Sequence, residues 1–220
     1  MKRKFLHTVF FLFLTTLFSG CSTEKNTRVS RAYHNVTSRY NIYFNGKESL
    51  KAGLERIDQT VEDDFTRILP VFKDSEPSAA KVAKSDMDNA ILKASKLVQM
   101  HSITKKPKRR RLRTRSYQEF ASREEFNNWV DDSYLLMGKA YFYQHNFISA
   151  TDNFSQVVRK FSEEETRYDA LVWLIRCYSE TERFSEASEV ILSLQADNSF
   201  PRRLERELAQ VTADYYLKQK

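Results

Sequence analysis

Glycine and proline are scarce in this chain of 220 residues, which contains four of each. An average protein of this length would have about three times as many. β-Sandwiches and dinucleotide-binding enzymes need these residues for tight turns and phosphate-binding loops, so the composition disfavours both classes. Cysteine is also scarce: the chain has two, which are too few to build a disulfide scaffold. With 41% hydrophobic residues the chain has enough apolar material for a core, and we expect a soluble, mostly helical protein.

The first twenty residues (1–20) have the pattern of a lipoprotein signal peptide. Residues 2–4 are basic and residues 5–18 are mostly apolar, a run shorter than the roughly 18 residues of a membrane-spanning helix. The sequence that ends at Cys21 resembles a bacterial lipobox, in which the cysteine is acylated and becomes the first residue of the mature chain. Ser22 follows, which favours an outer-membrane anchor facing the periplasm. The alternative is an ordinary signal peptide with an incidental Cys21.

The remaining cysteine and the histidines form no catalytic or metal-binding pattern. Cys177 lies in an apolar helical stretch, where we expect a small buried hydrophobe rather than a nucleophile. The four histidines are scattered, and no pair has the spacing of metal ligands. We therefore expect a protein that is not an enzyme and that uses no cofactor, no metal, no nucleic acid and no small-molecule substrate.

The positive charge of the chain is concentrated in one short segment. The formal net charge is +7, and three of the 36 basic residues lie in the signal peptide. A single run holds eight more and no acidic residue, so the rest of the mature chain is mildly acidic. The run is either a solvated loop or a contact for an anionic partner such as lipid headgroups, lipopolysaccharide or an acidic protein face. Its basic residues are Lys105, Lys106, Lys108, Arg109, Arg110, Arg111, Arg113 and Arg115.

The C-terminal half carries an internal repeat of 37 residues, whose register is set by Tyr141, Tyr178 and Tyr215. Apolar residues three, four and seven positions apart line one helix face, and small residues such as Gly138 and Ala150 would let two helices approach closely. The pattern resembles the tetratricopeptide repeat (TPR). It predicts an all-α fold of helical hairpins stacked as a TPR-like α-solenoid. The expected helices span 123–144, 147–161, 165–180, 184–196 and 201–219, with turns at 145–146 and 181–183.

The repeat register also yields a candidate partner-binding groove, because the first helix of each tetratricopeptide unit lines the concave face. The alternative is that these residues are ordinary solvent-facing side chains. If they form a groove, reversing Lys139 and Arg176 together should weaken partner capture without unfolding the protein. The expected groove residues are Asp132, Lys139, Tyr143, Asp169, Arg176, Glu180 and Tyr216.

The order of these features predicts four regions. The signal peptide is followed by a lipid tether and an N-terminal helical hairpin (21–62), in which Asn45 and Gly46 would break the helix. Residues 63–118 would form a linker with one helix (about 77–102) and a basic loop (103–118). Residues 119–220 would hold the repeats. The last repeat has only its first helix, so it is either a terminal cap or, as we favour, the front part of a longer protein.

Three segments of the N-terminal half have distinctive sequences: the tyrosine- and asparagine-rich stretch 33–46, the apolar segment 68–72, and the helix end 99–103. Together with the lipobox, the basic linker and the repeats, they resemble the tetratricopeptide lipoproteins of gliding motility and type IX secretion (the SprE/PorW family). The resemblance implies a periplasm-facing scaffold on the outer membrane, which would bind other proteins of the secretion and motility machinery. No catalysis is implied.

Two other functions fit the same sequence features. One is a tetratricopeptide lipoprotein of outer-membrane barrel assembly, which would also use repeats on a lipid anchor. The other is the helical front end of an envelope enzyme, for example one that remodels peptidoglycan.

Overall fold

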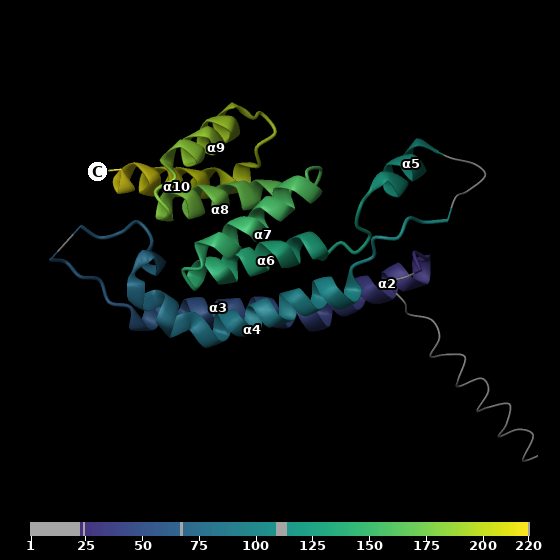
Figure 1. Ribbon diagram of the computed structural model, residues 1–220, viewed down its shortest axis with the longest axis horizontal. Helices are drawn as coiled ribbons and strands as arrows, with labels where there is room; N and C mark the ends of the chain where they lie inside the picture. Colours follow the sequence, from purple (N-terminus) through teal and green to yellow (C-terminus); the bar gives the residue numbers. More distant parts are fainter. Residues whose placement is uncertain (1–22, 24, 67, 109–113, 220) are drawn as a thin grey trace, which may run out of the picture.

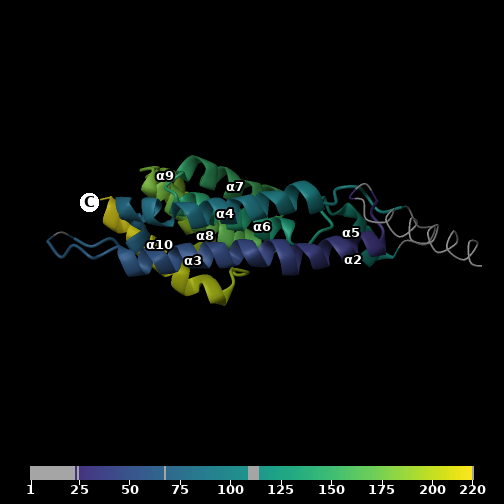
Figure 2. The same cartoon turned by 90° about the horizontal axis from the view of Figure 1, so that it is seen from below.

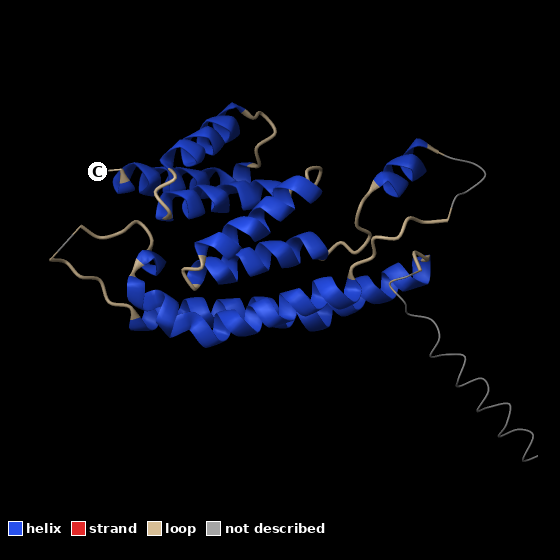
Figure 3. Cartoon of the chain, viewed as in Figure 1, coloured by secondary structure: helices blue, strands red, loops and turns tan. Residues whose placement is uncertain are grey.

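A computed structural model describes residue 23 and residues 25–66, 68–108 and 114–219. Within these ranges the regular secondary structure is helical and contains no strand, which confirms the predicted all-α class (Figure 1 and Figure 3). The predicted signal peptide and Cys21 lie outside the described residues. None of the described helices combines the length and the apolar character that crossing a membrane requires.

The N-terminal half begins with one continuous rod of helix. α2 (Arg28–Thr37) runs directly into the π-helix η2 (Ser38–Tyr43), which runs into α3 (Phe44–Thr60). At about 1.5 Å per residue the rod is roughly 50 Å long. Figure 2 shows it extending along the length of the molecule. The predicted hairpin within 21–62 is therefore wrong.

Gly46 explains why the expected break does not occur. The residue is buried inside α3, and a Cβ on it would lie 3.0 Å from Leu136 Cδ2 and 3.3 Å from Lys93 Cβ. The missing side chain thus lets α3 approach its neighbours closely, and the helix continues. Local sequence alone does not separate a glycine that ends a helix from one that permits packing.

The rod forms its hairpin with α4 (Pro77–His101), which confirms the helix expected at about 77–102 but not its place in a linker. α3 and α4 lie side by side, and the buried face of α4 is lined largely by alanines, which bring the two helices close together. The connection between them contains the short 3-10 helix η3 (Lys73–Ser75). The α3–α4 hairpin is thus the first layer of the stack.

Five further helices continue the stack behind this hairpin. Each packs on the one before it, except that α10 lies mainly along α8. The predicted helices are confirmed to within a few residues, apart from the first, which begins at Val130 instead of residue 123. The helices are α6 (Val130–Tyr143), α7 (Phe147–Lys160), α8 (Thr166–Glu180), α9 (Phe184–Ala196) and α10 (Glu205–Lys218), the last preceded by the 3-10 helix η4 (Arg202–Leu204).

The segment before α6 is held in a non-helical conformation by Glu125. One oxygen of its carboxylate accepts hydrogen bonds from the backbone N–H groups of Ile103 (2.7 Å), Phe126 (2.9 Å) and Asn127 (2.8 Å). Side-chain acceptance of backbone donors competes with helix formation. A separate short helix, α5 (Arg115–Ser122), precedes this segment and occupies the end of the predicted basic loop.

The 37-residue period appears in the backbone as well as in the sequence. His145 and Glu182 both adopt positive φ angles, 57° and 58°, in the turns that follow α6 and α8. In each turn the next residue donates its N–H to the carbonyl of the register tyrosine, Asn146 to Tyr141 at 2.9 Å and Arg183 to Tyr178 at 2.8 Å. Both predicted turns are confirmed, and they have the same geometry.

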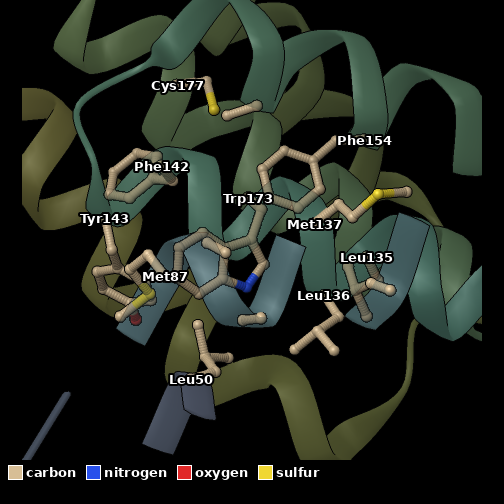
Figure 4. Packing of buried hydrophobic residues seen from close by; sticks show 14 of the residues in the cluster. Leu50, Met87, Leu135, Leu136, Met137, Phe142, Tyr143, Phe154, Trp173 and Cys177 are labelled. Atoms are coloured by element: carbon tan, nitrogen blue, oxygen red, sulfur yellow. The ribbon is translucent and has the colours of Figure 1, made fainter. Parts of the chain in front are cut away.

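The main core lies between α3, α4 and the first helices of the stack. Figure 4 shows Trp173 at its centre, with Phe142, Tyr143 and Phe154 around it. Phe154 is fully buried and stacks on Trp173 with a centroid distance of 5.8 Å. Cys177 is also buried, and burial raises the pKa of its thiol to about 12, which confirms the prediction of a small hydrophobe.

Candidate partner-binding face

Three of the seven predicted groove residues lie together on the first helices of the repeats. Asp132 and Lys139 are on α6, and Asp169 occupies on α8 the register position of Asp132. All three side chains are half-buried. Arg203, just before α10, makes a bidentate ion pair with Asp169 at 2.7 and 3.1 Å. The first helices therefore present a charged face.

The charges on this face perturb one another. The pKa of Asp132 is raised to about 7 by burial and by the carboxylates of Asp131 and Asp169. Burial lowers the pKa of Lys139, while Glu207, Asp169 and Asp132 oppose that shift. The Lys139 ammonium lies 5.2 Å from the centroid of the Trp173 ring. A charged partner that covered this face would desolvate the carboxylates and Lys139 further, and their pKa values would shift again.

The expectation that Arg176 lines an open groove is wrong. Its side chain is 4% exposed and ion-paired with Asp74 at 2.7 Å. Its guanidinium also lies over the rings of Phe72 and Phe142, 3.9 and 4.4 Å from their centroids. The segment that joins α3 to α4 therefore covers this part of α8. Reversing Arg176 would place two carboxylates in a buried site, so the double reversal with Lys139 would unfold the protein rather than test binding.

Two further residues of the predicted groove are engaged within the stack. Tyr143 is buried, and its ring packs on Trp173 with a centroid distance of 5.6 Å. Glu180 accepts hydrogen bonds from Ser75 at 2.7 Å and from Lys218 at 2.8 Å, so it joins η3 to α10. Tyr143 and Glu180 thus hold the stack together.

Tyr216 lies on a different surface from the charged residues. Its side chain is 61% exposed and lines a cavity of about 750 Å³ between α9 and α10. Leu208, Phe200 and Ala213 contribute apolar lining to this cavity, and Arg202 and Glu205 stand at its border. An apolar hollow with an exposed tyrosine suits a side chain or helix from another protein.

The basic run is only partly described, since Arg109, Arg110, Arg111 and Arg113 lie outside the described residues. Lys106 donates hydrogen bonds to the carbonyls of Ser122 (2.9 Å) and Arg123 (2.6 Å). Arg115 begins α5 and pairs with Glu119 at 3.1 Å. Lys105, Lys106 and Lys108 line a cavity together with the N-terminal residues before and within α2. Four of the eight residues are therefore placed, and three of these share one cavity.

A buried histidine pair is the polar feature that the sequence analysis missed. His34 on α2 and His101 at the end of α4 meet with 2.8 Å between their Nδ1 atoms, although they are far apart in the chain. Asn127 extends the network by donating hydrogen bonds to Ser38 Oγ (2.8 Å) and to the carbonyl of His101 (2.9 Å). Both histidines lie within the stretches 33–46 and 99–103 singled out in the sequence, which is the signal that could have suggested their contact.

The histidine pair predicts a loss of stability in acid. Burial lowers the pKa of His34, and burial together with the charges of His34 and Lys96 lowers that of His101, both from an ordinary value of 6.5. As the pH falls below 6.5 the unfolded chain takes up protons first, so stability is full above this pH and is lost as the pH falls through the folded-state values. Protonation of both rings would also put a hydrogen on each Nδ1 and break the contact.

We expect the free energy of unfolding to fall by on the order of 1 kcal/mol between pH 7.5 and 5, measured by urea unfolding. The reference is the double variant His34→Gln/His101→Gln, because the raised pKa values of Asp131, Asp132 and Asp214 act in the opposite direction in both proteins. Identical pH dependence in the two proteins would rule out the pair as the cause.

Comparison with known proteins adds no relationship to this geometry: no protein-family model matches the chain, and a search of curated proteins finds no similar sequence.

Proposed function

We propose that this protein is a lipid-anchored, periplasm-facing adaptor of the outer membrane, acting in type IX protein secretion and gliding motility. It binds other proteins through TPR-like helical pairs and carries no catalytic site. Acylated Cys21 holds it in the membrane. The lipobox pattern supports the anchor, and the sequence resemblance described above supports the role in secretion.

The observation that carries the adaptor role is the exposed face at the far end of the stack. The half-buried charges of Asp132, Lys139 and Asp169 form a separate surface on α6 and α8. Tyr216 and the apolar cavity between α9 and α10 are accessible at the far end. This end lies away from α2 and the N-terminal side of the chain in both views (Figure 1, Figure 2). A repeat stack whose far end lies away from α2 suits the capture of a second protein.

The TPR identity is supported by two features that share one register. The tyrosines Tyr141, Tyr178 and Tyr215 recur every 37 residues, and the turns after the first two have matching backbone geometry. Ala150 and Ala187 are fully buried at the positions where the second helices meet the first. This combination supports the proposed TPR-like repeat type.

A deletion strain complemented with variants tests the proposal. Deleting the gene should lower secreted cargo selectively and leave the amounts of outer-membrane barrels normal. Complementation with Tyr216→Ala should restore less than half of the secretion that wild type restores, because the variant removes an exposed aromatic contact. The matched control is Ile148→Ala on α7, which removes a side chain that is 78% exposed elsewhere on the stack.

Immunoblots must show equal amounts of each variant, so that stability does not account for a loss of secretion. A general depletion of barrels would point to barrel assembly instead. Normal secretion in the deletion strain would reject the secretion role, and full complementation by Tyr216→Ala would remove the cavity between α9 and α10 as the contact.

A further inference from the structure

A cavity at the N-terminal end of the molecule is lined by positive charge. It measures about 820 Å³ and is bordered by residues from three separated segments: the chain around the start of α2, the basic run after α4, and α5. Among the residues that the structure describes, no acidic side chain lines it. The six cationic residues that border it are Lys25, Arg28, Arg31, Lys105, Lys106 and Lys108.

Hydrogen bonds between the three segments hold these cations together. Asn26 donates to the carbonyl of Lys105 at 2.7 Å, which joins the N-terminal segment to the basic run. Tyr117 on α5 donates to the carbonyl of Lys108 at 2.6 Å, and Lys106 donates to the carbonyls of Ser122 and Arg123 at the end of the same helix. These hydrogen bonds fix the walls of the cavity largely through backbone carbonyls.

Three of the cations are available to a ligand. Within the described part of the chain, the side chains of Lys25, Arg28 and Lys108 make no hydrogen bond and no ion pair. All three are exposed. Like charges gathered in one place repel one another, and an anion bound between them would remove that repulsion.

One wall of the cavity is aromatic. Phe120 on α5 lies under the guanidinium of Arg31 at 4.9 Å and packs on Phe126 with a centroid distance of 5.1 Å. Tyr117 borders the same cavity. Aromatic side chains beside cations are the arrangement that proteins use at the interface between a bilayer and water.

From this cavity we infer a binding site for the phosphorylated headgroup of an anionic membrane lipid. The inference rests on the proposed lipid anchor in one respect. Lys25 is four residues from Cys21, a reach of at most about 14 Å, so an acylated Cys21 would keep the cavity at the membrane surface. The headgroup would come from the leaflet that holds the anchor, and its binding would orient the α2–α3 rod relative to that surface.

Vesicle co-sedimentation tests the site without the anchor. The processed chain from residue 21, with Cys21→Ser so that no acyl group contributes, is mixed with vesicles of phosphatidylcholine alone or with 30% phosphatidylglycerol. We expect binding to the phosphatidylglycerol vesicles only. The variant Lys25→Gln/Arg28→Gln/Lys108→Gln should bind on the order of 100-fold more weakly, since each basic residue near an anionic surface contributes about a factor of five.

The control neutralises three exposed cations far from the cavity, Lys81→Gln/Arg202→Gln/Arg206→Gln, and should bind within about threefold of the parent protein. Circular dichroism checks that all three proteins are folded. An equal loss in the control would mean general attraction of a basic chain, and equal binding to phosphatidylcholine alone would exclude a charge-based site; either result overturns the inference.

Two titrations separate the membrane source from a soluble anion. Inorganic phosphate and glycerol phosphate at millimolar concentration should not displace the protein from vesicles. Displacement by either would identify a free phosphate ligand and overturn the lipid assignment. α9 and α10, which form the cavity that Tyr216 lines, lie at the end of the molecule away from α2 and α5 (Figure 1). Failure of vesicle binding would therefore leave the complementation result of Tyr216→Ala unchanged, so the two proposals fail separately.

Discussion

Replacing Arg176 by alanine is expected to lower the free energy of unfolding by about 3–5 kcal/mol, because the change breaks a buried ion pair. The Asp74 carboxylate, 13% exposed, would lose its partner at 2.7 Å. The rings of Phe72, Phe142 and Trp173 would lose the cation that lies within 3.9 to 4.8 Å of their centroids. Urea unfolding of the two proteins measures the difference.

Arg203 provides a matched control, because its ion pair also involves a residue of α8. It binds Asp169 of α8 at the same distance, 2.7 Å, but its side chain is 49% exposed. Exposed ion pairs contribute about 0–1 kcal/mol, so Arg203→Ala should cost far less than Arg176→Ala. Similar losses in the two variants would show that burial does not set the contribution of these ion pairs to stability. They would contradict the claim that the buried pair between Arg176 and Asp74 is the stronger one.

Replacing the whole buried pair provides a second check. In Arg176→Met/Asp74→Leu no charge is left without a partner, and the methionine can still pack on Trp173 and Phe142. We expect the double variant to recover a large part of the stability that Arg176→Ala loses, since buried pairs are often no more stable than apolar residues of similar volume. A double variant as unstable as Arg176→Ala would mean that packing, not the unpaired Asp74, dominates the loss.

The fate of Arg176 shows what the sequence could predict and what it could not. The register of α6 and α8 follows from apolar spacing within each helix, so the helices, their turns and their charged face were accessible from local patterns. The cover over Arg176 comes from Asp74, which lies before α4 and far away in the chain. Nothing in the spacing around either residue encodes that pairing.

The same limit explains the N-terminal half. The chain continues as helix through Asn45 and Gly46 because α4 and α6 pack on Gly46, a contact that only the assembled stack provides. The contact between His34 and His101 also joins segments that are separated in sequence. Both lie in the stretches that carry the family resemblance. These stretches therefore build buried contacts between α2, α3, α4 and α6 rather than an exposed binding surface.

Gly138 is the site of the second large effect that we predict. A Cβ at this position would lie 2.5, 2.7 and 2.8 Å from three ring atoms of Phe154, closer than non-bonded atoms can approach. Phe154 is fully buried and stacked on Trp173, so its ring has little room to move. Overpacking of this kind typically costs about 1–3 kcal/mol, and the helix propensity that alanine gains over glycine offsets up to about 1 kcal/mol. We expect Gly138→Ala to lose about 2 kcal/mol.

Gly53 separates the effect of the clash from that of the backbone. It lies inside α3, and a Cβ there would also come within 2.5 Å of another atom, but that atom is the terminal methyl carbon of Met87. A methionine chain end can rotate away, whereas a buried aromatic ring cannot. Gly53→Ala should therefore change stability by at most about 1 kcal/mol in urea unfolding. If Gly53→Ala lost as much stability as Gly138→Ala, the rigidity of the Phe154 ring would not be the cause of the loss at Gly138.

Shrinking the ring should relieve the clash. In Gly138→Ala/Phe154→Leu the new methyl group meets a smaller and more flexible side chain, so the double variant should lose less than the sum of the two single changes. An additive result would mean that α6 and α7 separate to admit the methyl group. The distance between α6 and α7 at Gly138 could then change, and contact with the Phe154 ring would not explain the stability that Gly138→Ala loses.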